Sequence, residues 1–151
     1  MALTTFGAIM GFAAGMVKEA EEAYKVLAEK AKDGTLKEVL ETFSIEEGKN
    51  HVLMVKTRRE NVTEMILEPV SGLYREDYGI DLQDLGSGED TDLLRAALAL
   101  EERGKRFFQE ASAKVPLPEV ARIFRKVAER KEENLKRLQG LGLSKTFERR
   151  N

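Results

Sequence analysis

The feature that most constrains this 151-residue chain is an internal repeat. An ungapped shift of 84 residues lays Val17–Met54 on Glu101–Leu138. Within each copy, apolar residues recur at spacings of three and four, the period of an amphipathic helix. Two helical hairpins of equal length and equal apolar rhythm predict an all-α antiparallel four-helix bundle. The matched core positions are Tyr24 with Phe108, Leu36 with Val120, Leu40 with Phe124, Phe43 with Val127, and Met54 with Leu138.

Composition excludes several classes of function. The formal net charge is −2, with acidic and basic residues interleaved, so the chain lacks the single-sign field of a nucleic-acid binder. It has no cysteine, which excludes disulfides, thiolate metal sites and cysteine nucleophiles. His51 is the only histidine, and no phosphate-binding loop or nucleophile elbow is present.

Residues 1–17 carry no charged side chain. A secretory signal begins with basic residues, and the first here is Lys18. A membrane-spanning helix needs about 20 predominantly apolar residues, and this run is shorter and contains glycines. We therefore expect the start of a buried amphipathic helix in a cytoplasmic protein with no membrane partner. Peripheral membrane binding through this run is the alternative.

Local signals predict four helices and their ends. Asp33-Gly34 breaks the first helix, and Thr35 with Glu38 forms a capping box for the second. Pro118 suits the first position of the fourth helix, and Gly140 suits its end. The expected helices are 5–32, 36–67, 91–113 and 119–139, in a bundle of residues 1–140 followed by a polar tail, 141–151.

Residues 68–91 form a long connection rich in glycine. Its length predicts a crossover between the second and third helices rather than a tight hairpin. Gly7, Gly11 and Gly15 share one face of the first helix, and such spacing lets a neighbouring backbone approach closely. Together with apolar crossover residues, this face predicts a homodimer. Those crossover residues are Leu73, Tyr74, Tyr78, Ile80, Leu82 and Leu85.

Polar residues interrupt the apolar stripes of both hairpins at one depth. They are Glu47 and Asn50, then Glu101, then Lys131 and Asn134, while Val17 occupies the matching position of the first helix. Charged residues are rarely buried unless paired, so these positions predict a layer of facing polar groups. The alternative is a helix rotation that places them at the surface.

Three segments carry a resemblance to a known family: Ala13–Glu29, Ala97–Glu102 with Phe107-Phe108, and Phe124–Glu129. In them the chain resembles the ferritin-like superfamily, and within it the rubrerythrin-type diiron proteins. The resemblance implies a two-iron site in the bundle core. Its ligands would be a Glu on the first and third helices, each seven residues before an aromatic, and Glu-x-x-His on the second and fourth.

Most of the implied ligands are replaced. Val17 stands where the first Glu would be, and Asn50 and Asn134 stand where the histidines would be. Lys131 stands at a third Glu position. Of the six implied ligands only Glu47 and Glu101 remain.

We therefore expect a non-catalytic structural or interaction module with no catalytic residue, metal or cofactor. Lys131 is expected to take over the metal's charge by pairing with Glu101 or Glu47, with the two amides satisfying the remaining lone pairs. The alternative is a diiron oxidoreductase handling peroxide or dioxygen. It would bind iron through Glu47, His51 and Glu101, with Glu21 as an extra acid. Tyr24 is either a core residue or a hydrogen-bond donor to a buried carboxylate.

Overall fold

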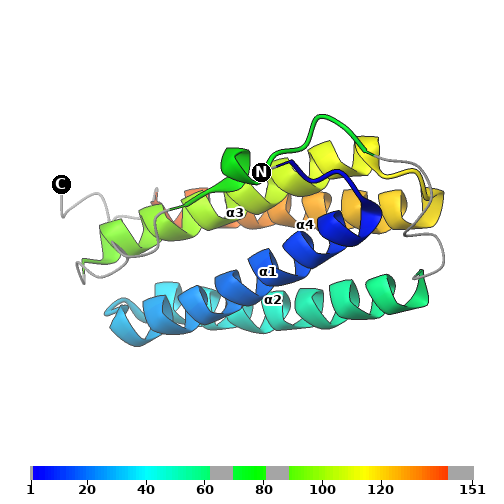
Figure 1. Ribbon diagram of the computed structural model, residues 1–151. Coiled ribbons are helices and arrows are strands. Elements are labelled where there is room, and N and C mark those ends of the chain that lie inside the picture. Colours follow the sequence, from blue (N-terminus) through cyan, green and yellow to red (C-terminus); the bar gives the residue numbers. More distant parts are fainter. Residues whose placement is uncertain (1, 62–69, 81–88, 143–151) are drawn as a thin grey trace.

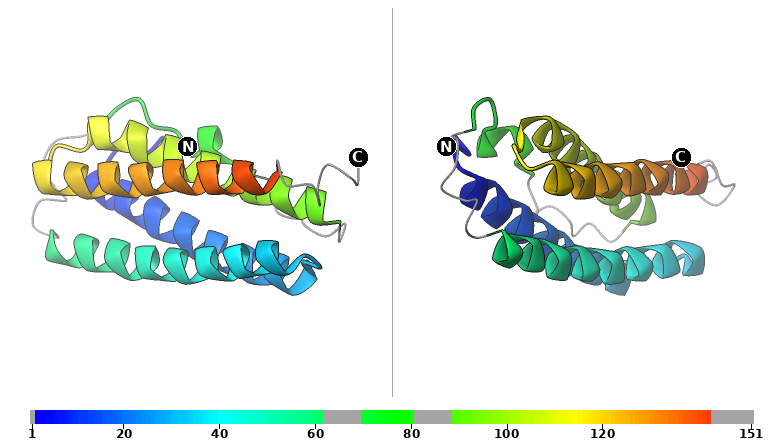
Figure 2. Two further views of the ribbon diagram at one scale, coloured as in Figure 1. Left: turned by 180° about the vertical axis from the view of Figure 1, so that it is seen from behind. Right: turned by 90° about the vertical axis from the view of Figure 1, so that its right-hand side faces the viewer.

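The chain forms a four-helix bundle made of two packed hairpins (Figure 1). The computed structural model describes residues 2–61, 70–80 and 89–142. Helices α1 (Phe6–Lys30) and α2 (Gly34–Glu60) form one hairpin. Helices α3 (Asp90–Lys114) and α4 (Pro118–Gly142) form the other, and the two hairpins lie face to face as two layers (Figure 2). The prediction of a helical bundle is confirmed.

Helices α2 and α3 run in the same direction, because α2 ends and α3 begins at opposite ends of the bundle (Figure 1). Part of this crossover, residues 70–80, packs on the start of the chain and contains the short 3-10 helix η2 (Arg75–Tyr78). The Leu3 amide donates to the Leu73 carbonyl at 2.8 Å. Leu73 and Tyr78 are buried in the core, so they pack on this chain itself. Leu82 and Leu85 lie outside the described residues.

The start of α2 differs from the prediction. Its N-cap is Asp33, whose Oδ2 accepts from the Leu36 amide at 2.9 Å, and Thr35 lies inside the helix. Aspartate caps as well as threonine does. The buried Asp90 carboxylate also fixes the turn, because it accepts from the backbone amides of Lys32 and Asp33, each at 2.9 Å.

Two helix ends also differ. Helix α2 ends at Glu60 with Asn61 as its C-cap, and the predicted extension to Leu67 lies outside the described residues. Helix α4 passes through Gly140 to Gly142. A glycine ends a helix by adopting a left-handed conformation, and Gly140 does not have a positive φ. The predicted helix end at residue 139 is therefore three residues early, and 143–151 lie outside the described residues.

The core consists of two apolar clusters, one toward each end of the bundle. The first gathers around Phe107, Phe108 and Phe124, and the second around Leu27, Leu40 and Leu100. All the matched core positions of the repeat are buried in both copies: Tyr24 and Phe108, Leu36 and Val120, Leu40 and Phe124, Phe43 and Val127, Met54 and Leu138.

The uncharged start of α1 contributes to the first cluster through Phe6, Ile9, Met10 and Ala13. Across the described ranges, no helix combines the length and apolar character that a bilayer crossing requires.

Candidate functional site

A buried polar layer lies between the two clusters, and Lys131 is at its centre. The Lys131 ammonium nitrogen lies 2.8 Å from Glu47 Oε2 and 3.3 Å from Glu101 Oε2. The side chains of these three residues are at most 3 % exposed. The predicted pairing of Lys131 is thus confirmed, and it involves both carboxylates. The alternative of a surface location is wrong for these residues.

Neutral side chains donate further hydrogen bonds to the carboxylates of Glu47 and Glu101. Asn50 Nδ2 donates to Glu47 Oε1 at 2.8 Å, and Asn134 Nδ2 donates to Glu101 Oε1 at 2.8 Å. The Tyr24 hydroxyl donates to Glu101 Oε2 at 2.6 Å and its ring lies in the second apolar cluster, so Tyr24 fills both of the roles considered for it. All four carboxylate oxygens of the layer therefore accept a hydrogen bond.

The layer reaches the surface on the α2–α4 side. Asn134 Nδ2 also donates to Glu46 Oε1 at 2.7 Å, and Arg130 Nε donates to Glu46 Oε2 at 3.0 Å. Arg130 is more than half exposed, and Asn50 is half-buried. The network thus runs from solvent-facing Arg130 through Glu46 and Asn134 to the buried Glu101.

Other residues considered from the sequence lie outside this network. Val17 is buried in the first apolar cluster. His51 is half-buried one position past Asn50. Glu21 pairs with Lys18 and Lys25 and lies over Gly48 on the α1–α2 side. It therefore does not join the polar layer as an extra acid. A helix turns by about 100° per residue, so one position is enough to carry a side chain out of a buried layer.

Burial and the neighbouring charges together set the protonation states of Lys131 and Tyr24. Burial alone lowers the pKa of Lys131, but the charges of Glu101 and Glu47 and their hydrogen bonds outweigh it and raise the pKa. Burial raises the pKa of Glu47, against the opposing effect of Lys131. The pKa of Tyr24 is raised well above its usual range, by burial and then by the neighbouring Glu101. Lys131 therefore stays a cation and Tyr24 a neutral donor.

Space for the lysine is made by Gly104 on α3. A Cβ added to Gly104 would lie 2.6 Å from both Cδ and Cε of Lys131, so the lysine stem crosses directly over this glycine. An interior glycine costs a helix about 1 kcal/mol relative to alanine. A glycine in mid-helix, three residues after Glu101, is a sequence signal for this contact, although the pattern of polar residues alone did not predict it.

The residues of the layer do not fit a pair of iron ions. Iron needs carboxylates with free lone pairs and open coordination positions. Here an ammonium bridges the two carboxylates, and every carboxylate oxygen already accepts from a protein donor. In the described part of the chain, no three His, Asp or Glu residues gather in a way that suits a metal ion.

Three ion pairs between the hairpins join positions that are equivalent in the repeat. They are Glu19 with Arg103 at 2.8 Å, Glu46 with Arg130 at 3.0 Å, and Glu47 with Lys131 at 2.8 Å. Each pair is separated by 84 residues, the shift of the repeat. Two identical elements related by a two-fold axis bring each near-axis residue to its own counterpart. Opposite charges at equivalent positions were therefore a readable signal for these contacts.

Comparison of the chain with protein-family models, with curated proteins and with solved structures found no match.

Proposed function

We propose that this chain is a ferritin-like bundle of the rubrerythrin type in which an ion-paired polar layer has replaced the diiron site. It acts as a non-catalytic structural or interaction module. The observation that carries the proposal is the Lys131 ammonium, which bonds both remaining carboxylates from a position where the resemblance calls for a metal-binding Glu. The duplicated hairpins and the crossover between α2 and α3 support the ferritin-like assignment.

The layer has the chemistry of a structural element. A cation that takes part in acid–base work must exchange its proton near neutral pH, and the two carboxylates raise the pKa of Lys131. A buried ion pair adds little net stability but can specify how helices pair. The layer therefore serves to fix the register of the two hairpins.

Metal content tests this proposal. After expression with added iron, we expect the wild-type protein to carry no stoichiometric iron by elemental analysis. The Lys131→Glu variant removes the ammonium and gathers three carboxylates, so we expect it to bind added Co²⁺ with visible absorption bands. Lys131→Gln is the matched control, since it removes the charge without adding a carboxylate. Stoichiometric iron in the wild-type protein would overturn the proposal and favour the oxidoreductase that handles peroxide or dioxygen.

We further propose that the module is a homodimer, and that α2 supplies the interface. Ile45 and Val52 are 63 % and 66 % exposed on α2, with Gly48, over which Glu21 of α1 lies, between them. An antiparallel pairing of two α2 helices about a two-fold axis beside Gly48 places Ile45 opposite Val52 of the second copy. The same axis places Glu38 opposite Arg59 and Glu41 opposite Lys56, so the exposed charges of the strip are self-complementary.

Light scattering at micromolar concentration should give twice the chain mass of 17.0 kDa. Val52→Glu places a charge against an apolar residue of the second copy and should give monomers. Val26→Glu is the control, because Val26 is 40 % exposed on α1, outside the strip.

Glu41→Lys should weaken the dimer and adding Lys56→Glu should restore it. A monomeric wild-type protein contradicts the dimer, and a dimer indifferent to Val52→Glu contradicts this interface.

A further inference from the structure

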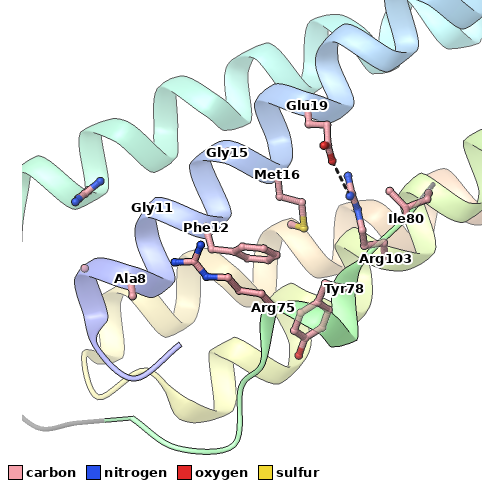
Figure 3. A pocket seen from close by; sticks show the side chains of 13 residues that line it. Ala8, Gly11, Phe12, Gly15, Met16, Glu19, Arg75, Tyr78, Ile80 and Arg103 are labelled. Atoms are coloured by element: carbon pink, nitrogen blue, oxygen red, sulfur yellow. Dashed lines mark hydrogen bonds and ion pairs between the residues drawn. The ribbon is translucent and has the colours of Figure 1, made fainter. Parts of the chain in front are cut away.

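The glycine face of α1 borders a groove instead of a neighbouring helix (Figure 3). The groove has a volume of about 570 Å³ and lies between α1, residues 75–80 and α3. A Cβ added to Gly15 would meet no atom of the described residues within 4 Å. The predicted close backbone approach at Gly11 and Gly15 is therefore absent among the described residues. Phe12 and Tyr78, whose ring centroids are 6.1 Å apart, form part of the groove wall.

The lining is cationic at its polar positions and apolar elsewhere. Arg58, Arg75 and Arg103 line the groove, and among the described lining residues only Glu19 is acidic, which leaves a formal excess of two positive charges. The rest of the wall includes Phe12, Met16, Tyr78 and Ile80. Such a lining suits a small molecule with an apolar body and an anionic end.

Arg103 is the decisive residue of this groove. Its side chain is only 7 % exposed, and its Nη1 donates to Glu19 Oε1 at 2.8 Å (Figure 3). Its Nε and Nη2 are buried and have no acceptor among the described residues. Buried polar groups are nearly always paired, and unpaired donors on a cation are particularly costly. Nε–H and Nη2–H point the same way from one edge of the guanidinium, the edge that grips a carboxylate with two parallel hydrogen bonds.

We propose that this groove binds a small monocarboxylate with an apolar tail. The carboxylate accepts from Nε and Nη2 of Arg103, while Nη1 keeps its bond to Glu19. The tail lies along Gly11 and Gly15, against Phe12. Since both free N–H groups are sealed from water, the ligand reaches them only when side chains of the groove wall move aside.

Calorimetric titration with octanoate tests the proposal on the full chain. We expect saturable binding of one octanoate per chain and no binding of octanol, which has the same tail without the charge. Arg103→Lys keeps the positive charge but loses the two-bond edge, so the dissociation constant should rise about tenfold or more. Arg103→Leu should abolish binding while its melting temperature equals or exceeds that of the wild type, because two unsatisfied buried donors are removed.

Blocking the groove gives a second, independent measurement. Gly15→Leu places a side chain in the groove beside α1, where an added Cβ meets no described atom within 4 Å, and should abolish octanoate binding. Gly140→Leu is the matched control in α4, where an added Cβ also meets no described atom within 4 Å, and it should bind like the wild type. The proposal is overturned by absent octanoate binding, by equal binding of octanol, or by wild-type binding in Gly15→Leu. A Gly15→Leu protein that loses its dimer would assign the groove to a second copy of the chain.

Discussion

Replacing Lys131 with methionine is expected to lower the free energy of unfolding by about 3–5 kcal/mol, the usual result of removing one partner of a buried ion pair. Methionine preserves most of the side-chain volume, so packing changes little. The loss comes from Glu47 and Glu101, which remain buried without a countercharge. Urea unfolding of wild type and variant gives the difference directly.

A second substitution should recover much of this loss, and the structure indicates which one. Glu47→Leu removes one carboxylate and leaves only Asn50 without its partner, and Asn50 is half-buried near the rim. Glu101→Leu would instead leave the buried Tyr24 hydroxyl with only a long bond to the Ala97 carbonyl at 3.4 Å, and leave Asn134 with Glu46 alone. In a Lys131→Met background, Glu47→Leu should therefore restore more stability than Glu101→Leu does.

The control for this cycle is a surface pair from the same hairpin. Lys105 Nζ lies 2.6 Å from Glu132, and both side chains have contact with solvent. Lys105→Met should cost no more than about 1 kcal/mol, as exposed pairs do. If the effects of Lys131→Met and Glu47→Leu simply add, the two residues are not energetically coupled and the layer is not the unit described above.

Adding one methyl group at Gly104 is expected to destabilise the bundle. The new Cβ would lie 2.6 Å from two stem carbons of Lys131, whose nitrogen is held by both carboxylates and cannot move aside freely. Overpacking of this kind costs about 1–3 kcal/mol, against which the better helix propensity of alanine returns about 1 kcal/mol. Gly104→Ala is therefore expected to lose up to about 2 kcal/mol of stability, which urea unfolding would measure.

Gly15→Ala provides the opposite case in α1. No described atom lies within 4 Å of its added Cβ, so only the gain in helix propensity remains, up to about 1 kcal/mol of added stability. Two glycine-to-alanine changes in two helix interiors are thus expected to have opposite signs. If Gly104→Ala also stabilised the protein, the close contact with the lysine stem would be contradicted.

The repeat made the fold and the centre of the polar layer predictable. Leu40 and Phe124, or Met54 and Leu138, revealed the inward faces because apolar periodicity and burial coincide in a helix. Lys131 and Glu47 were found at one depth for the same reason. Periodicity gives the depth and face of a residue, and opposite charges at one depth in a core can only be paired.

Finer details required the three-dimensional arrangement. Asp33 and Thr35 are both N-cap residue types; in the structure Asp33 caps the Leu36 amide, and the Asp33 amide in turn donates to Asp90. Gly11 and Gly15 have the spacing of a close helix contact, but the crossover segment with Tyr78 occupies that side. The unpaired edge of Arg103 has no sequence signal, because no local pattern reveals which edge of a guanidinium lacks an acceptor.

The three ion pairs between equivalent positions determine which hairpins can combine. Two copies of the first hairpin, placed as α1–α2 lies on α3–α4, would set Glu47 against Glu47 and Glu19 against Glu19, and like charges face to face cost several kcal/mol. Two copies of the second hairpin would do the same with Lys131 and Arg103. Each hairpin therefore pairs favourably with the other hairpin and unfavourably with a second copy of itself. Two chains that exchange whole hairpins keep the three ion pairs between unlike hairpins. Two chains that pair identical hairpins lose these ion pairs.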